Sequence, residues 1–187
     1  MAHEKALLED IKRLIKCGKY RIRIHAIRHM IEEGFNEEDI IEAVTGRSKI
    51  LEDYPDEFRC LILGRFYFTD RAISPLHIVC EYPRNDFVDM VDQPNEKRED
   101  IMKEQKGLME QPCSECGGTL EKKYISQEFE REGIKIRLSG IKAWVCNGCG
   151  EIYFQPGGAD KVVKAASCLF ELALTEEQHK GTLTAQI

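Results

Sequence analysis

Two short stretches decide how the second half of the chain folds: CSECGG at residues 113–118 and VCNGCG at residues 145–150. Each holds two cysteines separated by two residues, and glycine follows each second cysteine. A CxxC loop brings two thiolates to one ion at about 2.3 Å each, and glycine accepts the backbone conformation that turns amides toward sulfur. We therefore expect one closed, structural Zn²⁺ site formed by Cys113, Cys116, Cys146 and Cys149.

The residues between the two cysteine pairs indicate how the pairs meet. Residues 119–133 and 134–145 alternate apolar and polar side chains, and Gly133 permits a turn between them. The resulting β-hairpin accounts for a spacing longer than the roughly 15–20 residues usual for such sites. Iron is the main alternative for four thiolates, and a redox CxxC or two disulfides are the others. No βαβ pattern surrounds either motif, which argues against the redox alternative.

A last helix is predicted over residues 159–174, with Val162, Ala166, Leu169 and Phe170 on one stripe. This stripe could pack on the hairpin or form a homodimer. Together, CSECGG, the hairpin, SGIKAWVCNGCGE and this helix resemble the YgiT-type zinc-finger domain of MqsA antitoxins. The resemblance covers about residues 113–174 and implies a protein-binding antitoxin module.

The first half predicts helices followed by strands. Apolar spacing indicates helices near 7–15 and 24–33, the second ending at Gly34, and a third that starts at Asn36 and stops at Gly46. The segments KILEDY, FRCLILG, RFYFTD, PLHIVCEY and DFVDMV then predict an antiparallel sheet of about four strands. The expected class is α+β, with a first domain at 1–92, a charged linker at 93–112 and the zinc ribbon at 113–187.

The first domain also carries candidate residues for RNA cleavage. That reaction needs a base for the 2′-OH, a cation for the phosphorane and an acid for the leaving oxygen. His25 and Arg28 share one helix face with His29, and His77 lies in a strand that could pack beside it. Phosphate contacts are predicted for Arg21, Arg23, Arg59 and Arg65. Each of these residues could instead have a structural or surface role, and His25 with His29 also forms an HxxxH pair that could bind metal.

Residues 20–91 resemble BrnT-type toxins, which have the RelE-like fold. The resemblance rests on YRIRIHAIRHMIEEGFNEEDIIEAV, KILEDYP, CLILG and PLHIVCEY. It implies a metal-independent endoribonuclease that acts on RNA. Combined with the second half, it predicts a toxin–antitoxin fusion in which the zinc module neutralises the toxin-type domain within one chain. A non-catalytic, zinc-binding interaction protein is the alternative, and a nucleic-acid-binding zinc ribbon is the third.

Composition sets the remaining expectations. The chain of 187 residues has a net charge of −6, so it is not an obvious nucleic-acid binder as a whole. Seven basic residues and no acidic one nevertheless lie between positions 11 and 31. There is no long apolar run and no apolar signal region, so we expect a cytoplasmic protein with no membrane span. The four single cysteines are predicted to be small buried hydrophobes: Cys17, Cys60, Cys80 and Cys168.

Overall fold

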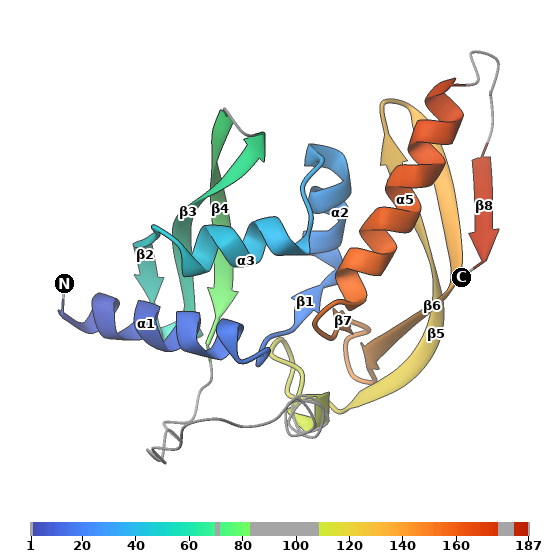
Figure 1. The fold of residues 1–187 in the computed structure, drawn as a ribbon. Coiled ribbons are helices and arrows are strands. Elements are labelled where there is room, and N and C mark those ends of the chain that lie inside the picture. Colours follow the sequence, from blue (N-terminus) through green and yellow to red (C-terminus); the bar gives the residue numbers. More distant parts are fainter. Residues whose placement is uncertain (1, 70–71, 83–108, 176–181, 187) are drawn as a thin grey trace. The chain divides into compact units, whose positions relative to one another are not determined.

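The computed structural model describes residues 2–69, 72–82, 109–175 and 182–186, and it confirms the α+β class (Figure 1). The chain divides into two compact units. The first, called here the sheet unit, contains Met1–Tyr20 and Glu38–Gly107. The second, the ribbon unit, contains Arg21–Glu37 and Leu108–Ile187. A segment from the first half of the sequence therefore belongs to the unit that holds the four cysteines.

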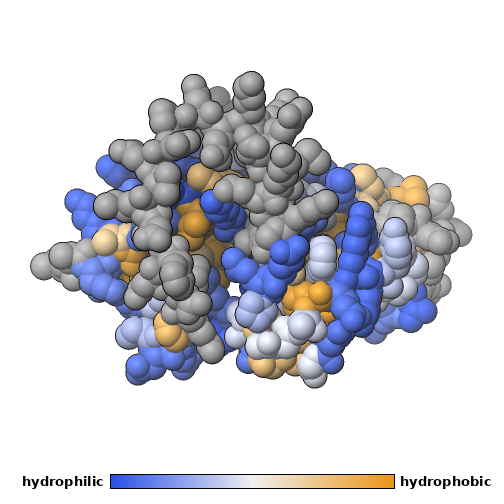
Figure 2. Space-filling view, turned by 90° about the horizontal axis from the view of Figure 1, so that it is seen from below, coloured by the Kyte–Doolittle hydropathy of each residue, from blue (hydrophilic) through white to orange (hydrophobic). Residues whose placement is uncertain are grey.

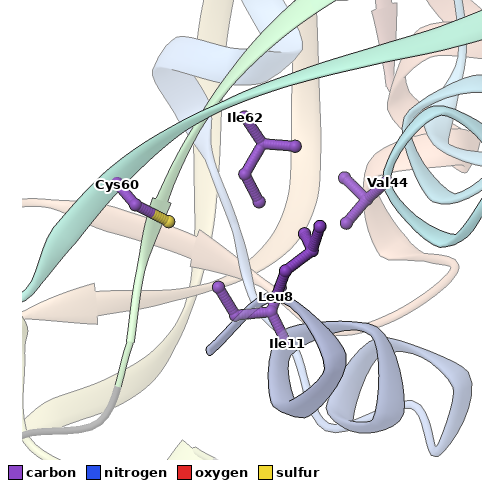
Figure 3. Close-up of a cluster of buried hydrophobic side chains, with 5 residues drawn as sticks. All are labelled: Leu8, Ile11, Val44, Cys60 and Ile62. Atoms are coloured by element: carbon purple, nitrogen blue, oxygen red, sulfur yellow. The ribbon is translucent and has the colours of Figure 1, made fainter. Parts of the chain in front are cut away.

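The sheet unit has two helices against one face of an antiparallel sheet. Its elements are α1 (Ala2–Lys16), α3 (Glu37–Thr45), β2 (Lys49–Tyr54), a 3-10 turn at Pro55–Glu57, β3 (Arg59–Thr69) and β4 (Ala72–Glu81). The strand order is β2-β3-β4. Figure 3 shows its core, where Leu8 and Ile11 of α1 face Val44 of α3 and Cys60 and Ile62 of β3. The helix predicted near 7–15 and the third helix are both confirmed.

The segments FRCLILG and RFYFTD form one strand, although two were predicted. Gly64, the last residue of FRCLILG, was expected to end a strand. It instead pairs with Leu76 in the middle of the sheet. A Cβ atom on Gly64 would lie only 2.1 Å from the backbone oxygen of Ala43. Glycine at this position therefore lets α3 approach β3 closely. The described residues contain three strands of this sheet, and the predicted strand DFVDMV lies outside them.

The ribbon unit is built on the long predicted hairpin, β5 (Leu120–Arg131) and β6 (Ile134–Cys146). Arg131 pairs with Ile134, and the two turn residues between them, Glu132 and Gly133, both have positive φ. This is the backbone that a two-residue hairpin turn of the I′ type requires. The remaining elements are β1 (Ile22–Arg23), α2 (Ile24–Glu33), β7 (Ile152–Phe154), α5 (Gly158–Thr175) and β8 (Thr182–Gln186).

The sheet of the ribbon unit joins distant parts of the sequence. Its order is β1-β7-β6-β5, and β8 pairs with β6 in parallel. The pairing of β1 with β7 sets Ile22 opposite Phe154 and Arg23 opposite Tyr153. A strand of two residues from the first half of the chain thus forms one edge of the ribbon sheet.

Helices α2 and α5 share the core of this unit with the strands of its sheet. Ile27, Met30 and Ile31 of α2 are buried, as predicted, and α2 ends at Gly34 in the left-handed conformation. On α5 the buried residues are Ala159, Val162, Val163, Ala166, Phe170 and Ala173. Helix α5 contacts both β6 and α2. The predicted apolar stripe is therefore packed within its own unit, while Leu172 and Leu174 remain exposed on α5.

Glu37 fixes the junction between α2 and α5. Its side chain is buried, with 2% exposed, and its two carboxylate oxygens accept hydrogen bonds from the backbone amides of Gly157 at 2.7 Å and Asp160 at 3.1 Å. These amides lie at the start of α5, where helical N–H groups have no partner in the helix and attract negative charge. A residue of the first half therefore caps the last long helix.

The prediction for the single cysteines is confirmed for Cys60, which is buried, and Cys80 is partly buried. It is wrong for Cys17 and Cys168, which are exposed. Cys17 follows the last residue of α1. Cys168 lies between Ala166 and Phe170, and a step of two residues on a helix points away from the buried stripe. In the space-filling view of Figure 2, apolar residues reach the surface in separate areas among hydrophilic ones.

Candidate metal centre

The four predicted cysteines meet in the ribbon unit. Their sulfur atoms all lie within 4.8 Å of one another, with 3.6 Å between Cys113 and Cys149 and 3.4 Å between Cys116 and Cys146. Four sulfurs at about 2.3 Å from a central ion lie about 3.8 Å apart in a tetrahedron. The sulfurs form this cluster across the base of the hairpin, so the site suits a structural Zn²⁺ ion.

Two similar loops present the sulfurs. In the first, the amide of Gly117 donates to the carbonyl of Cys113 at 2.8 Å; in the second, that of Gly150 donates to Cys146 at 3.0 Å. Gly117 and Gly150 have φ of 72° and 78°, as the predicted role of glycine after each CxxC requires. The amide of Asn147 also donates to the carbonyl of Thr119 at 3.0 Å, which ties one loop to the other.

Two further glycines leave room for the sulfurs. A Cβ atom on Gly118 would lie 3.0 Å from the sulfur of Cys146, and one on Gly148 would lie 3.0 Å from that of Cys116. The amide of Gly148 is 3.3 Å from the sulfur of Cys146. Hydrogen bonds from the amide of Cys149 and, more weakly, that of Gly148 lower the pKa of the Cys146 thiol to about 6, although burial opposes them. The second loop thus favours the thiolate at Cys146, the form that binds metal. The pKa of the Cys149 thiol is instead raised to about 12 while no ion is bound, because a backbone hydrogen bond that lowers it is outweighed by burial and by the neighbouring cysteines.

Tyr153 of β7 forms a second layer behind the cysteines. Its side chain is buried, and its hydroxyl lies 3.3 Å from the sulfur of Cys113 and 2.9 Å from Oγ of Ser114. Burial raises the pKa of this tyrosine to about 12, so the hydroxyl keeps its proton and can donate it toward sulfur. Such contacts orient metal ligands. Leu120 and Trp144 pack against the same cluster.

Arg21 and Arg23, which precede α2, contact residues in or next to both cysteine loops. The guanidinium of Arg21 lies 4.7 Å from the centre of the Tyr153 ring, and its nitrogens are 3.4 and 3.5 Å from the carbonyls of Gln111 and Pro112. Arg23 pairs with Glu115 in the first loop and with Glu151, at 3.3 Å, just after the second. These arginines, predicted to contact phosphates, hold ribbon residues in this structure.

The candidate catalytic residues fall into the two units. His25, Arg28 and His29 share one side of α2 in the ribbon unit and are exposed. Arg28 donates to Oε1 of Gln127 on β5 at 3.1 Å. His77 lies in β4 of the sheet unit and is exposed. The catalytic and RNA-binding roles of all these residues stay predictions.

One face of the sheet unit gathers three of the predicted RNA residues. Leu63 pairs with His77 and Arg65 with Pro75, so His77 and Arg65 lie on the face opposite the buried Cys60 and Ile62. Arg59 is on the same face and pairs with Glu81 at 2.9 Å. We call this side of β2-β3-β4 the open face. It also carries Tyr67, which is 62% exposed.

Comparison with known proteins identifies one region. Residues 22–91 match the family model described as Domain of unknown function (DUF4258). No curated protein and no solved structure matches the chain. The matched region begins at β1, so its first strand and helix are the ones that lie in the ribbon unit. Among the described residues no helix is long and apolar enough to cross a membrane.

The sequence did not predict the two neighbours of the metal centre, Tyr153 and the short strand β1, nor the cap that Glu37 forms on α5. A strand of two residues has no periodicity that could reveal it. IYF at 152–154, directly after the second CxxC, carries a β-branched and aromatic signal. Glu37 was assigned to the start of the third helix, and only the tertiary structure shows that it also caps α5.

Proposed function

We propose that the chain is a self-bound pair, in which the zinc module binds the first strand and helix of the DUF4258 region. In this proposal the DUF4258 region is a ribonuclease of the BrnT type, and the zinc module keeps it silent as an antitoxin would. The observation that carries the proposal is that three arginines in the first half of the chain contact the zinc module. Arg21, Arg23 and Arg28 precede or belong to α2, and each one contacts residues of the zinc module.

These contacts match the expected action of an antitoxin. A cation that pairs with glutamate or holds an amide oxygen is less available to a phosphate group, and loss of phosphate contacts weakens RNA binding whatever the base sequence. Arg23 alone pairs with Glu115 and Glu151, one near each CxxC loop. The zinc module would therefore need its metal to present both glutamates to the arginine.

The open face supports RNA as the partner of the DUF4258 region. Arg65 and Tyr67 on β3 and His77 on β4 are exposed there. Arginine binds phosphate, tyrosine stacks on bases, and histidine can transfer a proton near neutral pH. In the proposed reaction His25 accepts the 2′-OH proton and Arg28 stabilises the phosphorane, both from α2. His77, which belongs to the sheet unit, is a separate candidate for contact with RNA on the open face.

The test is to cut the full chain between its halves. A protease recognition sequence is placed within residues 93–107, the purified chain is cut, and the two pieces are separated under mild denaturant and refolded with Zn²⁺. We expect the N-terminal piece to cleave RNA, and addition of the C-terminal piece to suppress the cleavage. A piece that carries Arg28→Ala and His77→Ala serves as the inactive control.

Three outcomes decide between the hypotheses. RNA cleavage that the C-terminal piece suppresses would support the self-bound toxin. A folded N-terminal piece that binds the C-terminal piece and leaves RNA intact would reject the enzyme and favour a non-catalytic interaction protein. RNA binding by the C-terminal piece alone, with strong salt dependence, would favour the nucleic-acid-binding ribbon.

A further inference from the structure

His25 and His29 form a pair that the metal centre does not use. They are four residues apart on α2, so both rings stand on the same exposed side of the helix. Their Nε2 atoms lie 3.2 Å apart, and the ring centres are 4.7 Å apart with the planes nearly perpendicular. Both nitrogens that face each other are the outer ones of the imidazole rings. The two rings thus place two possible ligand atoms side by side.

This geometry suits a metal ion. Imidazole nitrogen binds Zn²⁺ at about 2.0–2.1 Å, and two such nitrogens in a tetrahedral shell lie about 3.4 Å apart. The observed 3.2 Å is close to this spacing. A hard ion such as Mg²⁺ prefers oxygen ligands and does not suit this pair.

The position of Glu32 is the second observation that supports a metal site at His25 and His29. Its carboxylate Oε2 lies 3.6 Å from Nδ1 of His29, on the ring nitrogen that does not face His25. A carboxylate on this side of the ring would accept from Nδ1–H once the two groups move slightly closer, and Nε2 would then be the nitrogen that binds metal. Metal-binding histidines commonly have such a carboxylate behind them, where it fixes the tautomer and the orientation of the ring.

The helix itself is held firmly behind the pair. Ile27 and Met30, on the other side of α2, are fully buried in the ribbon unit. The backbone positions of His25 and His29 are therefore fixed by packing, and metal binding only has to order two side chains. We propose that His25 and His29 form a second metal site, on the surface of α2, for a divalent ion of the Zn²⁺, Ni²⁺ and Cu²⁺ class, with water in the remaining positions.

The proposal has one functional consequence, which, unlike the site itself, rests on the proposed function. An ion on Nε2 of His25 occupies the lone pair that a general base needs. Metal binding at this site and proton transfer by His25 therefore exclude each other. Removal of the four-cysteine zinc is a separate event and does not test this pair.

The test measures zinc bound to the intact chain. The full-length protein, with Zn²⁺ on its four cysteines, is dialysed against rising concentrations of free Zn²⁺, and bound zinc per chain is measured by mass spectrometry. A second equivalent is expected for the wild type and for His77→Ala, an exposed histidine in β4 that serves as the matched control. The second equivalent should be lost in His25→Ala/His29→Ala and in His29→Gln. Mg²⁺ should not replace it.

Nitrogen NMR of the histidine rings identifies the atoms. Zinc should shift Nε2 of His25 and His29 and leave Nδ1 of His29 protonated. Glu32→Gln should weaken the second zinc about tenfold, whereas Glu33→Gln, its exposed neighbour on α2, should not. The proposal is overturned by the absence of a second equivalent in the wild type, by its retention in the double variant, or by equal loss in His77→Ala. Equal effects of the two glutamate variants would overturn the role of Glu32.

Discussion

The two units are stabilised in different ways. The sheet unit has a core of side chains from α1, α3 and β3, and the other side of its sheet is the open face. In the ribbon unit the two CxxC loops meet at a cluster of four cysteine sulfurs. Part of its core comes from α2, a helix from the first half of the chain. The boundary of a family match therefore need not be a boundary of folding, since residues 22–37 match DUF4258 and fold with the ribbon unit.

Loss of the metal should give the largest effect and should separate the two units. In Cys146→Ser the closed site loses a ligand, and structural zinc supplies on the order of 10 kcal/mol to small domains. We expect amides of β5 and β6 to lose protection from hydrogen exchange, while those of β3 keep it. Cys168→Ser is the matched control, because Cys168 is exposed and lies away from the cluster. Equal loss of protection in β3 would show that the units do not fold separately.

A cavity in the core of one unit should destabilise that unit and leave the other unchanged. Ile27→Ala on α2 removes a fully buried side chain and should destabilise the ribbon unit by about 2–5 kcal/mol. Ile62→Ala on β3, equally buried, should destabilise the sheet unit by a similar amount. Hydrogen-exchange rates of the β6 amides measure the stability of the ribbon unit, and those of the β3 amides measure that of the sheet unit. Ile27→Ala would contradict this account if it weakened β3 and left β6 unchanged.

The cap on α5 should have a smaller effect. Glu37→Ala removes the carboxylate that accepts two backbone hydrogen bonds, and this should cost the ribbon unit about 2 kcal/mol. Glu38→Ala, next to it and exposed, is the control and should change little. Denaturant unfolding, followed by the fluorescence of Trp144 in β6, measures the difference. Equal effects of the two substitutions would reject the cap.

The smallest effect is expected on the open face. Arg59 pairs with Glu81 at 2.9 Å, but the pair is partly exposed, so Arg59→Ala should lower the stability of the sheet unit by only about 0–1 kcal/mol. If the open face binds RNA, the same substitution should weaken binding of the N-terminal piece and reduce its salt dependence. A large loss of stability without any change in RNA binding would assign Arg59 a structural role.

Local chemistry allowed much of this structure to be predicted. The CxxC loops, the hairpin with its turn at Gly133, and helix α2 with its cap at Gly34 follow from spacing and from residues that permit particular backbone angles. The single strand across Gly64 was missed because glycine usually marks a break, and only the approach of Ala43 explains its presence. The pairing of β1 with β7 was also missed. It joins residues that lie over 120 positions apart in the sequence, and only two residues of each strand take part.

The contacts of the arginines also could not be predicted from local sequence. Sequence placed Arg21 and Arg23 in a basic stripe, which is typical of a nucleic-acid surface. The partners of Arg23, Glu115 and Glu151, lie 92 and 128 residues further along. No local pattern connects such residues. The proposed function therefore depends on a tertiary contact, and on whether that contact persists when the two halves are no longer joined.

Cutting the chain within residues 93–107 shows whether β1 and α2 bind the zinc module without the covalent link. We predict that the two pieces co-elute in size-exclusion chromatography with Zn²⁺ bound. We also predict that they separate in the cut Cys146→Ser chain, and that Arg23→Ala with Glu37→Ala weakens their association. Separation of the wild-type pieces while zinc remains on the C-terminal piece would contradict the account, since β1 and α2 would then not be the ligand of the zinc module.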